Sequence, residues 1–377
     1  MSLPRPKFTS ALHDERVAAI LGTALGVSFT ICFLTGLVSH LLQHPQSWFS
    51  WPARPVNLYR VTQGLHVVTG IASIPLLLAK LWAVYPKFWA WPPFKSVVQA
   101  AERLSLLPLV GGSLFLLFTG VLNIAYWYSP MRFSFPAAHY WAAWLTIGAL
   151  LVHIGAKATT TREVLFTRKP APPEAPKEGA LTRRGLIGAA AAGSATLVVV
   201  VAGQTLRPLN PLAVLAPRRP DVGPQGLPVN RSAREADVRA AALDPAYRLT
   251  LDGHGIGTPQ SWSLDQLAAM SQRRAGLPIA CVEGWSASAE WEGVPLGRLL
   301  NEAGIRGRPV RVHSLERQGT YKTSIVDANH AYDPDTLLAL RLNGEVLHVD
   351  HGYPARLIAP NRPGVLQTKW VTRVEVL

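Results

Sequence analysis

Apolar residues form long uninterrupted runs in the first half of the chain and short alternating runs in the second half. Four of the long runs could each cross a bilayer core of about 30 Å, which takes roughly 20 helical residues. A fifth run, rich in glycine and alanine, follows a proline-rich stretch. We therefore predict five membrane-spanning helices, at residues 17–42, 61–85, 106–128, 137–158 and 186–206.

The pattern of the second half is typical of a mixed α+β domain that is mostly β. Residues 247–251 alternate as a strand, and Ser263-Leu264-Asp265-Gln266 is a capping box that begins a short helix. We expect a further helix at 296–303. The other expected strands are 277–282, 310–313, 323–326, 347–349, 355–359 and 371–376.

Composition agrees with this division. The chain is 49% hydrophobic and only 16% charged, which excludes a disordered protein and an ordinary soluble enzyme. Most of the net charge of +14 lies before residue 206. Orientation of membrane loops explains that excess better than binding to nucleic acid does.

Loop charges also predict the orientation of the helices. The segments on one side of the membrane are rich in Lys and Arg, whereas the opposite loops carry only Arg54, Arg60 and Arg132. The positive-inside rule then makes the N-terminus cytoplasmic. Five crossings of a bacterial inner membrane place the C-terminal domain in the periplasm.

The predicted organisation has five parts: a four-helix domain at 1–165, a cytoplasmic linker at 166–185, the fifth helix at 186–206, a proline-rich tether at 207–229 and the C-terminal domain at 230–377. Arg183-Arg184 at the end of the linker resembles a twin-arginine export signal. The alternative is that the two arginines only anchor the fifth helix.

Histidines are the informative residues of the helical half, because an imidazole in hydrocarbon is costly unless it has a partner. His66 and His139 lie at similar depth on the second and fourth predicted helices, which suits the two axial ligands of a b-type haem. His153 follows His139 by about four turns, roughly 21 Å deeper, and would serve a second haem. The alternative is that these histidines only pack helices together.

This half resembles the four-helix b-type cytochrome subunits of bacterial formate dehydrogenases and nickel hydrogenases. The resemblance implies that His66 and His139 bind the outer haem and that His153 binds an inner one. The family's remaining ligand comes shortly after a Glu-Arg pair, but the four residues after Glu15-Arg16 include no histidine here, and His13 is a candidate stand-in. His40 could instead replace an outer ligand or bind a quinone head group.

Two cysteines, Cys32 and Cys281, exclude a disulfide framework, a four-cysteine zinc site and an iron–sulfur cluster bound by this chain alone. Cys281 lies at the end of a predicted strand. From spacing alone it could equally be a buried inert thiol or a functional one. A soft thiolate is a suitable ligand for molybdenum held by a dithiolene.

The stretch Cys281-Val282-Glu283-Gly284-Trp285-Ser286 and the later block His351-Gly352-Tyr353-Pro354-Ala355-Arg356 resemble the molybdopterin-binding domain of the sulfite-oxidase superfamily, above all protein-methionine-sulfoxide reductases. The resemblance implies a sulfite-oxidase-like fold for 230–377 and makes Cys281 the molybdenum ligand. The cofactor-contacting positions that it implies are Asn230, Ser314, His351, Arg356 and Lys369. Tyr321 is a candidate catalytic residue at the substrate mouth.

Together these features predict a membrane-bound oxidoreductase that contains Mo-molybdopterin and haem b. Molybdenum would transfer an oxygen atom in the periplasm, and haem would exchange electrons with the quinone pool. The Cys-Val-Glu-Gly-Trp-Ser motif favours reduction of a small-molecule or protein sulfoxide or another S- or N-oxide, whereas Lys369-Trp370 resembles the sulfite-oxidising branch. The alternatives are sulfite-oxidase-like oxidation and a cytochrome with a non-catalytic accessory domain.

Overall fold

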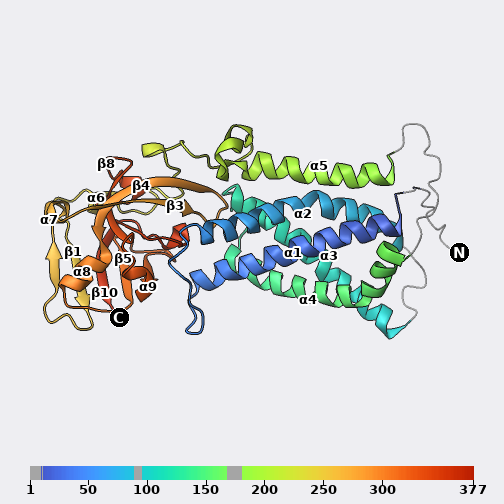
Figure 1. The fold of residues 1–377 in the computed structure, drawn as a ribbon, viewed down its shortest axis with the longest axis horizontal. Coiled ribbons are helices and arrows are strands. Elements are labelled where there is room, and N and C mark those ends of the chain that lie inside the picture. The colour runs from blue at the N-terminus through green and yellow to red at the C-terminus, as the bar shows by residue number, and fades with distance from the viewer. Residues whose placement is uncertain (1–9, 11, 89–95, 168–180) are drawn as a thin grey trace. The chain divides into compact units, whose positions relative to one another are not determined.

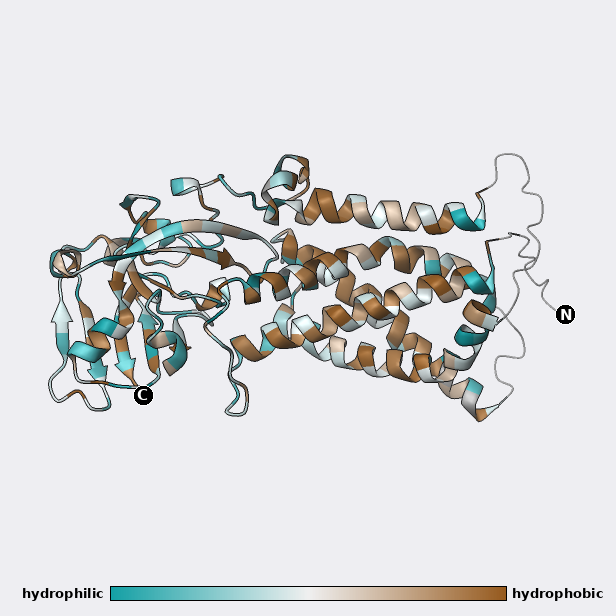
Figure 2. Ribbon diagram, in the orientation of Figure 1, coloured by the Kyte–Doolittle hydropathy of each residue, from teal (hydrophilic) through white to brown (hydrophobic). Residues whose placement is uncertain are grey.

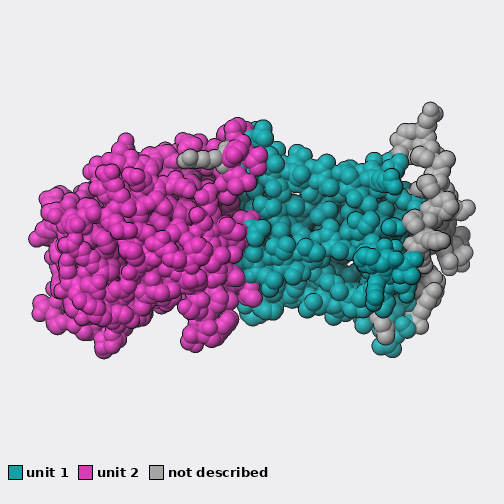
Figure 3. All heavy atoms as spheres, viewed as in Figure 1, with its two compact units in different colours: residues 1–36, 65–203, 212–217 teal, residues 37–64, 204–211, 218–377 magenta. Residues whose placement is uncertain are grey.

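The computed structural model describes residues 10, 12–88, 96–167 and 181–377 (Figure 1). It divides into two compact units (Figure 3). Unit 1 consists of residues 1–36, 65–203 and 212–217. Unit 2 consists of residues 37–64, 204–211 and 218–377, so it joins a segment from the first half of the chain to the C-terminal domain. Most of the predicted linker, residues 168–180, lies outside the described residues.

Within the described residues, five helices are long and apolar enough to cross a membrane, as predicted. Figure 2 shows their hydrophobic character along most of their length. They are α1 (Glu15–Gln43), α2 (Leu58–Phe88), α3 (Val97–Ile124), α4 (Phe135–Arg162) and α5 (Arg183–Ala202). The largest difference from the sequence prediction is α3, which begins at Val97 and ends before Tyr126. A backbone φ of 55° at Tyr126 stops the helix inside an apolar run that showed no break.

Small residues allow close contact between the helices of unit 1. Gly112 on α3 lies against Thr146 on α4, where a Cβ atom would come within 2.1 Å of the threonine hydroxyl oxygen. Ser194 on α5 donates a hydrogen bond of 2.7 Å to the carbonyl oxygen of Ala72 on α2. Close backbone approach and hydroxyl hydrogen bonds are the usual means of helix association in lipid.

Unit 2 contains two five-stranded sheets. The first has the order β2-β1-β10-β5-β6, and the second has the order β3-β4-β7-β8 with β9 also paired to β7. The strands are β1 (Leu249–Gly253), β2 (Gln260–Trp262), β3 (Arg273–Ala280), β4 (Ser286–Pro295), β5 (Val310–Ser314), β6 (Thr323–Val326), β7 (Leu337–Leu342), β8 (Glu345–Val346), β9 (Arg356–Ile358) and β10 (Val371–Val376). The short helices are α6 (Arg239–Ala242), α7 (Leu264–Ala269), α8 (Leu296–Glu302) and α9 (Ala328–Ala331).

Several local predictions for this domain are confirmed. The capping box forms at the start of α7, where Ser263 and Gln266 exchange hydrogen bonds. Strands β6 and β10 have the predicted bounds, and α8 begins at Leu296 as expected. The mixed α+β character follows from these elements.

The predicted strand at 347–349 is wrong. The chain forms a 3₁₀ turn at Val349–His351 instead, because the His348 side chain accepts a hydrogen bond from the backbone N–H of Asp350 and turns the chain. Strands β4 and β7 were not predicted. β4 is a central strand, and its Trp291 is fully buried in the core. It begins with small and polar residues that give no strand signal in the sequence, Ser286-Ala287-Ser288-Ala289-Glu290.

Gly293 allows β4 to pair with β7. A Cβ atom there would come within 2.2 Å of the Leu338 carbonyl oxygen and 2.5 Å of the Ala339 Cα. We expect Gly293→Ala to lower the free energy of unfolding by about 1–3 kcal/mol, because backbone atoms of β7 must move to accept the methyl group. Thermal unfolding followed by tryptophan fluorescence measures the change.

The matched control is Gly276→Ala on β3, where nothing lies within 4 Å of the added Cβ atom. This variant should be as stable as the wild type or slightly more stable. Equal midpoints for the two alanine variants would contradict the account of the β4–β7 contact.

Candidate active site

Cys281 directly follows β3 and is held by a tight turn. Its backbone N–H donates to the Trp285 carbonyl oxygen at 2.9 Å, and the Gly284 N–H donates to the Cys281 carbonyl oxygen at 3.0 Å. Gly284 has a φ of 91°, a conformation that favours glycine. The thiol is only 1% exposed, and the Asn230 amide nitrogen lies 3.9 Å from its sulfur. The turn therefore fixes the sulfur inside the domain beside a predicted cofactor-contacting residue.

The surroundings of Cys281 keep its thiol protonated. Burial raises the pKa of Cys281, and the nearby Glu283 carboxylate raises it further. Burial also raises the pKa of Glu283, whose carboxylate accepts a hydrogen bond of 3.1 Å from the Trp285 indole N–H. A bound metal cation would reverse this preference, because a coordinating thiol is deprotonated.

Arg356 is a buried guanidinium beside this thiol. It is 4% exposed, donates to the His351 carbonyl oxygen at 3.1 Å and lies 5.3 Å from the centroid of the Trp291 ring. Its Nε has no hydrogen-bond partner among the described residues. Burial lowers the pKa of Arg356 to about 9. A buried cation with a spare donor is suited to receive an anion from outside the chain.

Lys369 is a second, partly buried cation at this site. Its ammonium donates to the carbonyl oxygens of Arg231 at 2.9 Å and Asp350 at 2.8 Å. Burial, followed by repulsion from Arg356, lowers the pKa of Lys369 to about 7. Gly352 allows the segments that carry Lys369 and Arg356 to approach each other. A Cβ atom at Gly352 would come within 3.1 Å of Lys369 and 3.2 Å of Arg356.

Three other predicted residues have clear local roles. The Ser314 hydroxyl donates to the Lys369 carbonyl oxygen at 2.8 Å and so supports the lysine loop. The His351 ring is fully buried with its Nε2 at 2.7 Å from the Pro224 carbonyl oxygen, and its Nδ1 has no partner among the described residues. Burial lowers the pKa of His351 to about 3, which makes the ring neutral. The Tyr321 hydroxyl donates to the Gln43 side-chain oxygen at 2.8 Å.

Sequence reasoning missed other residues around the thiol. Glu283 was quoted only as part of a motif, although its carboxylate faces the thiol of Cys281. Arg218 contributes positive charge near Cys281 and Glu283, and Arg231 pairs with Glu316 at 2.7 Å. No local pattern marked them, because they lie in irregular segments far from Cys281 in sequence.

His66 and His139, the predicted haem ligands, lie close together in unit 1. The rings of His66 on α2 and His139 on α4 have centroids 6.3 Å apart at an interplanar angle of 68°. The Nδ1 atom of His66 lies 2.8 Å from the Cys32 carbonyl oxygen, and that of His139 lies 3.3 Å from the Thr119 hydroxyl. These contacts orient both rings in the way that outer partners orient metal-binding histidines, through Nδ1.

Glycine makes room for this pair, since a Cβ atom at Gly36 would come within 2.8 Å of the His66 ring. The contacts of His13 give less support to the predicted inner haem site. The His13 Nδ1 lies 3.1 Å from the Trp82 carbonyl oxygen, and the pairing of His13 with His153 stays a prediction. The His40 ring stacks on His44 with centroids 4.2 Å apart.

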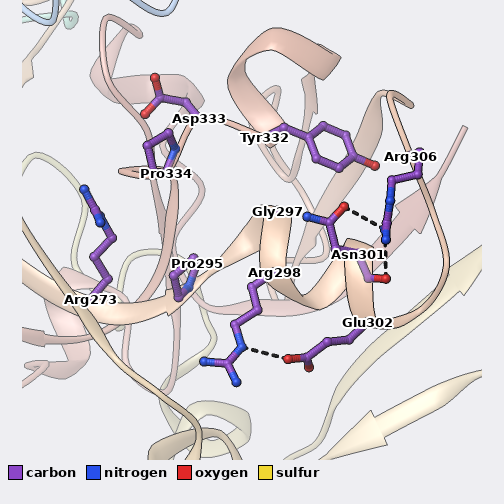
Figure 4. A pocket seen from close by; sticks show the side chains of 10 residues that line it. All are labelled: Arg273, Pro295, Gly297, Arg298, Asn301, Glu302, Arg306, Tyr332, Asp333 and Pro334. Carbon is purple, nitrogen blue, oxygen red and sulfur yellow. Dashed lines mark hydrogen bonds and ion pairs between the residues drawn. The ribbon is translucent and has the colours of Figure 1, made fainter.

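A surface pocket of about 530 Å³ lies elsewhere in unit 2, over α8 and the turn after α9 (Figure 4). It contains none of the predicted site residues. Its charged side chains are engaged with neighbours: Arg298 pairs with Glu302 at 2.7 Å, and Arg306 donates to Asn301. The candidate active site is therefore the Cys281 cluster, where buried polar groups have no hydrogen-bond partner among the described residues.

A buried thiol beside two cations, in a domain of two sheets, is an arrangement suited to a metal with an anionic cofactor. Residues 236–377 match the family model described as the oxidoreductase molybdopterin binding domain. The C-terminal part of this chain is therefore a molybdopterin-binding oxidoreductase domain of sulfite-oxidase type.

Three curated relatives with different activities are similar to parts of this chain. The chain is 31% identical over 163 residues, 43% of its length, to the putative protein-methionine-sulfoxide reductase subunit YedZ1 of Azospira oryzae, of which the match covers 60%. It is 30% identical over 162 residues, 36% of its length, to the mitochondrial sulfite oxidase of Rattus norvegicus, of which the match covers 30%. It is 40% identical over 96 residues, 24% of its length, to the NADPH nitrate reductase of Phytophthora infestans, of which the match covers 10%. The chain thus spans less than two thirds of each of these relatives.

The residues present fit molybdopterin. The cofactor needs a thiolate for its metal and cationic donors for its phosphate. Cys281 would bind molybdenum, and the spare Nε donor of Arg356, with Lys369 beside it, would receive the anionic part.

We expect millimolar sulfate, a dianion throughout, to raise the thermal midpoint of the cofactor-free protein more at pH 6 than at pH 8. Lys369 has a pKa of about 7, so its ammonium is charged at pH 6 and loses its charge as the pH rises through that value. Stronger anion binding to the folded state gives a larger stabilisation. Differential scanning fluorimetry at both pH values measures it.

Lys369→Met should abolish the difference between the two pH values. Arg356→Met should remove most of the sulfate effect at both, which separates binding from the general action of sulfate on proteins. A wild-type response that is equal at pH 6 and pH 8 would refute the assignment of Lys369.

Proposed function

We propose that this protein is a membrane-bound molybdopterin-dependent enzyme that removes an oxygen atom from an S- or N-oxide and takes its electrons from quinol through haem b. The observation that carries the proposal is the buried Cys281 thiol next to Arg356, whose Nε donor has no partner among the described residues. The His66–His139 pair in the same chain supports the link to haem.

Each residue of the site has a task in this proposal. Cys281 would supply the one protein sulfur to the metal. Bound molybdopterin supplies two-electron oxygen-atom transfer. Arg356 and Lys369 hold the anionic part of the cofactor, and the neutral His351 supports the loop that carries Arg356. Tyr321 stands at the substrate mouth with its hydroxyl held by Gln43.

The proposed electron path uses the helical half. His66 and His139 would hold a haem iron, and their Nδ1 contacts would keep Nε2 directed at it. A haem held by these two residues would supply one-electron transfer, and two such transfers would balance one oxygen-atom transfer. The positive-inside rule supports a periplasmic position for the molybdenum domain.

Reduction is favoured over oxidation by the Cys-Val-Glu-Gly-Trp-Ser motif and by the similarity to a putative protein-methionine-sulfoxide reductase subunit. The second candidate is oxidation of sulfite or a similar substrate, with electrons passed to quinone. The Lys369-Trp370 pair and the similarity to rat sulfite oxidase favour it.

The detergent-solubilised protein should contain about one molybdenum and one or two haems b per chain. In Cys281→Ser we expect the loss of sulfoxide reduction and of most of the molybdenum, because an alcohol is a harder and far more basic ligand than a thiol. Elemental analysis, the pyridine haemochrome assay and turnover with a quinol and methionine sulfoxide are the measurements.

Cys32→Ser is the matched control and should keep its molybdenum. Haem without molybdenum in the wild type, made in a host that synthesises the cofactor, would contradict the proposal. Turnover of sulfite but not of any S- or N-oxide would establish the second candidate in its place.

We expect His66→Ala and His139→Ala to lose a b-type haem spectrum and quinol-linked turnover while they keep molybdenum. Turnover driven by a reduced dye should survive, because the dye delivers electrons directly to the molybdenum domain. Visible spectra, metal analysis and the two assays are compared with the exposed control His44→Ala. An unchanged spectrum in both variants would mean that the helical half is only an anchor.

A further inference from the structure

A continuous chain of hydrogen bonds within unit 2 connects the candidate substrate residue to the peptide next to the molybdenum ligand. It begins at the Tyr321 hydroxyl, which donates to the Gln43 side-chain oxygen at 2.8 Å. The Gln43 amide nitrogen donates to the Ser39 hydroxyl at 3.3 Å, and Ser39 contacts the Tyr59 hydroxyl at 3.0 Å.

From Tyr59 the chain continues to Cys281. The Tyr59 hydroxyl donates to the Gln63 side-chain oxygen at 3.4 Å, and the Gln63 amide nitrogen donates to the Val282 carbonyl oxygen at 3.4 Å. Val282 follows Cys281 directly. Because Tyr59 donates to Gln63, Ser39 donates to Tyr59. Each side chain between Tyr321 and Val282 therefore accepts a hydrogen bond from the previous group and donates one to the next, so all the hydrogen bonds run in the same direction.

The inner members of this chain are shielded from water. Tyr59 is 1% exposed, Gln63 is 5% exposed and Ser39 is 8% exposed. Buried hydrogen-bond chains are strong and cooperative when every member is satisfied, and the loss of one member leaves costly unpaired groups. Within this shielded chain, water cannot readily replace a lost partner, unlike at a contact on an open surface.

The segment that supplies these residues, 37–64, is firmly attached to the C-terminal domain within unit 2. Asn361 is 3% exposed, accepts a hydrogen bond of 2.6 Å from the Tyr59 backbone N–H and donates to the Pro52 carbonyl oxygen at 2.6 Å. Arg54 forms a two-fold contact with Asp333, at 2.9 Å for each nitrogen–oxygen pair. These contacts fix the position of segment 37–64, and with it the hydrogen-bond chain, relative to Cys281.

We propose that Gln43, the last residue of α1, is a positioning residue of the molybdenum site. It fixes the Tyr321 hydroxyl at the substrate mouth, and the chain behind it ties that hydroxyl to the Cys281–Trp285 turn. The inference rests on the proposed function, because Tyr321 is a substrate-site residue only there.

Gln43 suits this task because both ends of its amide are engaged. Its nitrogen also donates to the Ser39 carbonyl oxygen at 3.0 Å, so the oxygen must face Tyr321. The phenol proton is thereby committed to Gln43. Burial raises the pKa of Tyr321, with a further contribution from Cys281, so the phenol keeps this proton in neutral solution. A fixed hydroxyl costs the bound substrate no further ordering.

The test combines kinetics with backbone exchange in the full-length protein in detergent. We expect Gln43→Leu to lower kcat/KM for methionine sulfoxide about three- to tenfold, the usual effect of one lost hydrogen bond. Tyr321→Phe should have an effect of similar size, and the double variant should be no worse than either single one. Gln43→Glu keeps an acceptor oxygen for Tyr321 but loses the donor to the Ser39 carbonyl oxygen, so it should recover only part of the activity.

A second readout does not need activity. Amide hydrogen exchange of the peptide that contains Tyr321 should become faster in Gln43→Leu, with or without molybdenum, while peptides of β10 stay unchanged. The matched control is Gln46→Leu, at an exposed position outside the hydrogen-bond chain, which should behave like the wild type in both measurements.

The outcomes distinguish failure of the proposed function from failure of the role of Gln43. Absence of molybdenum or of oxide turnover in the wild type defeats the proposed function, and the exchange experiment then still tests the contact of Gln43 with Tyr321. An active wild type with Gln43→Leu equal to Gln46→Leu overturns the role of Gln43 alone. Additive effects of Gln43→Leu and Tyr321→Phe overturn it as well, because independent sites do not share a task.

Discussion

The molybdenum half of the protein depends on a buried thiol whose surroundings do not stabilise its charged form. Cys281 is buried at the start of the turn after β3, next to the Glu283 carboxylate. Burial and this carboxylate both raise the pKa of the thiol. Arg356 and Lys369 stand in the same interior with pKa values lowered by burial. Buried groups of this kind are costly on their own, and a metal with an anionic cofactor would satisfy all of them together.

The fold explains how residues far apart in sequence reach this site. The second sheet places Cys281 at the end of β3 and Arg356 at the start of β9, while the loop before β10 carries Lys369. Gly352, with a φ of 116°, permits the close approach of the last two. The segment 37–64 belongs to the same unit, and its Gln63 donates a hydrogen bond to the carbonyl oxygen of Val282, the residue after Cys281.

Much of this could be predicted from sequence. The five apolar helices followed from run length, β6 and β10 followed from alternation, and Cys281, Arg356 and Lys369 followed from motifs. Strand β4 could not be recognised, because its small residues carry no alternating signal and only its partners β3 and β7 make it a strand. Gln43 and Gln63 were also invisible, since their roles depend on contacts more than 200 residues away in sequence.

The central claim is that electrons move between quinol and the molybdenum site through haem b. The direct measurement follows the haem absorbance of the purified protein after a quinol is added and then after methionine sulfoxide is added. The account predicts that quinol reduces the haem and that the sulfoxide reoxidises it, whereas Cys281→Ser becomes reduced and stays reduced. Haem that is reoxidised equally fast in wild type and Cys281→Ser, or that quinol does not reduce at all, would contradict the account.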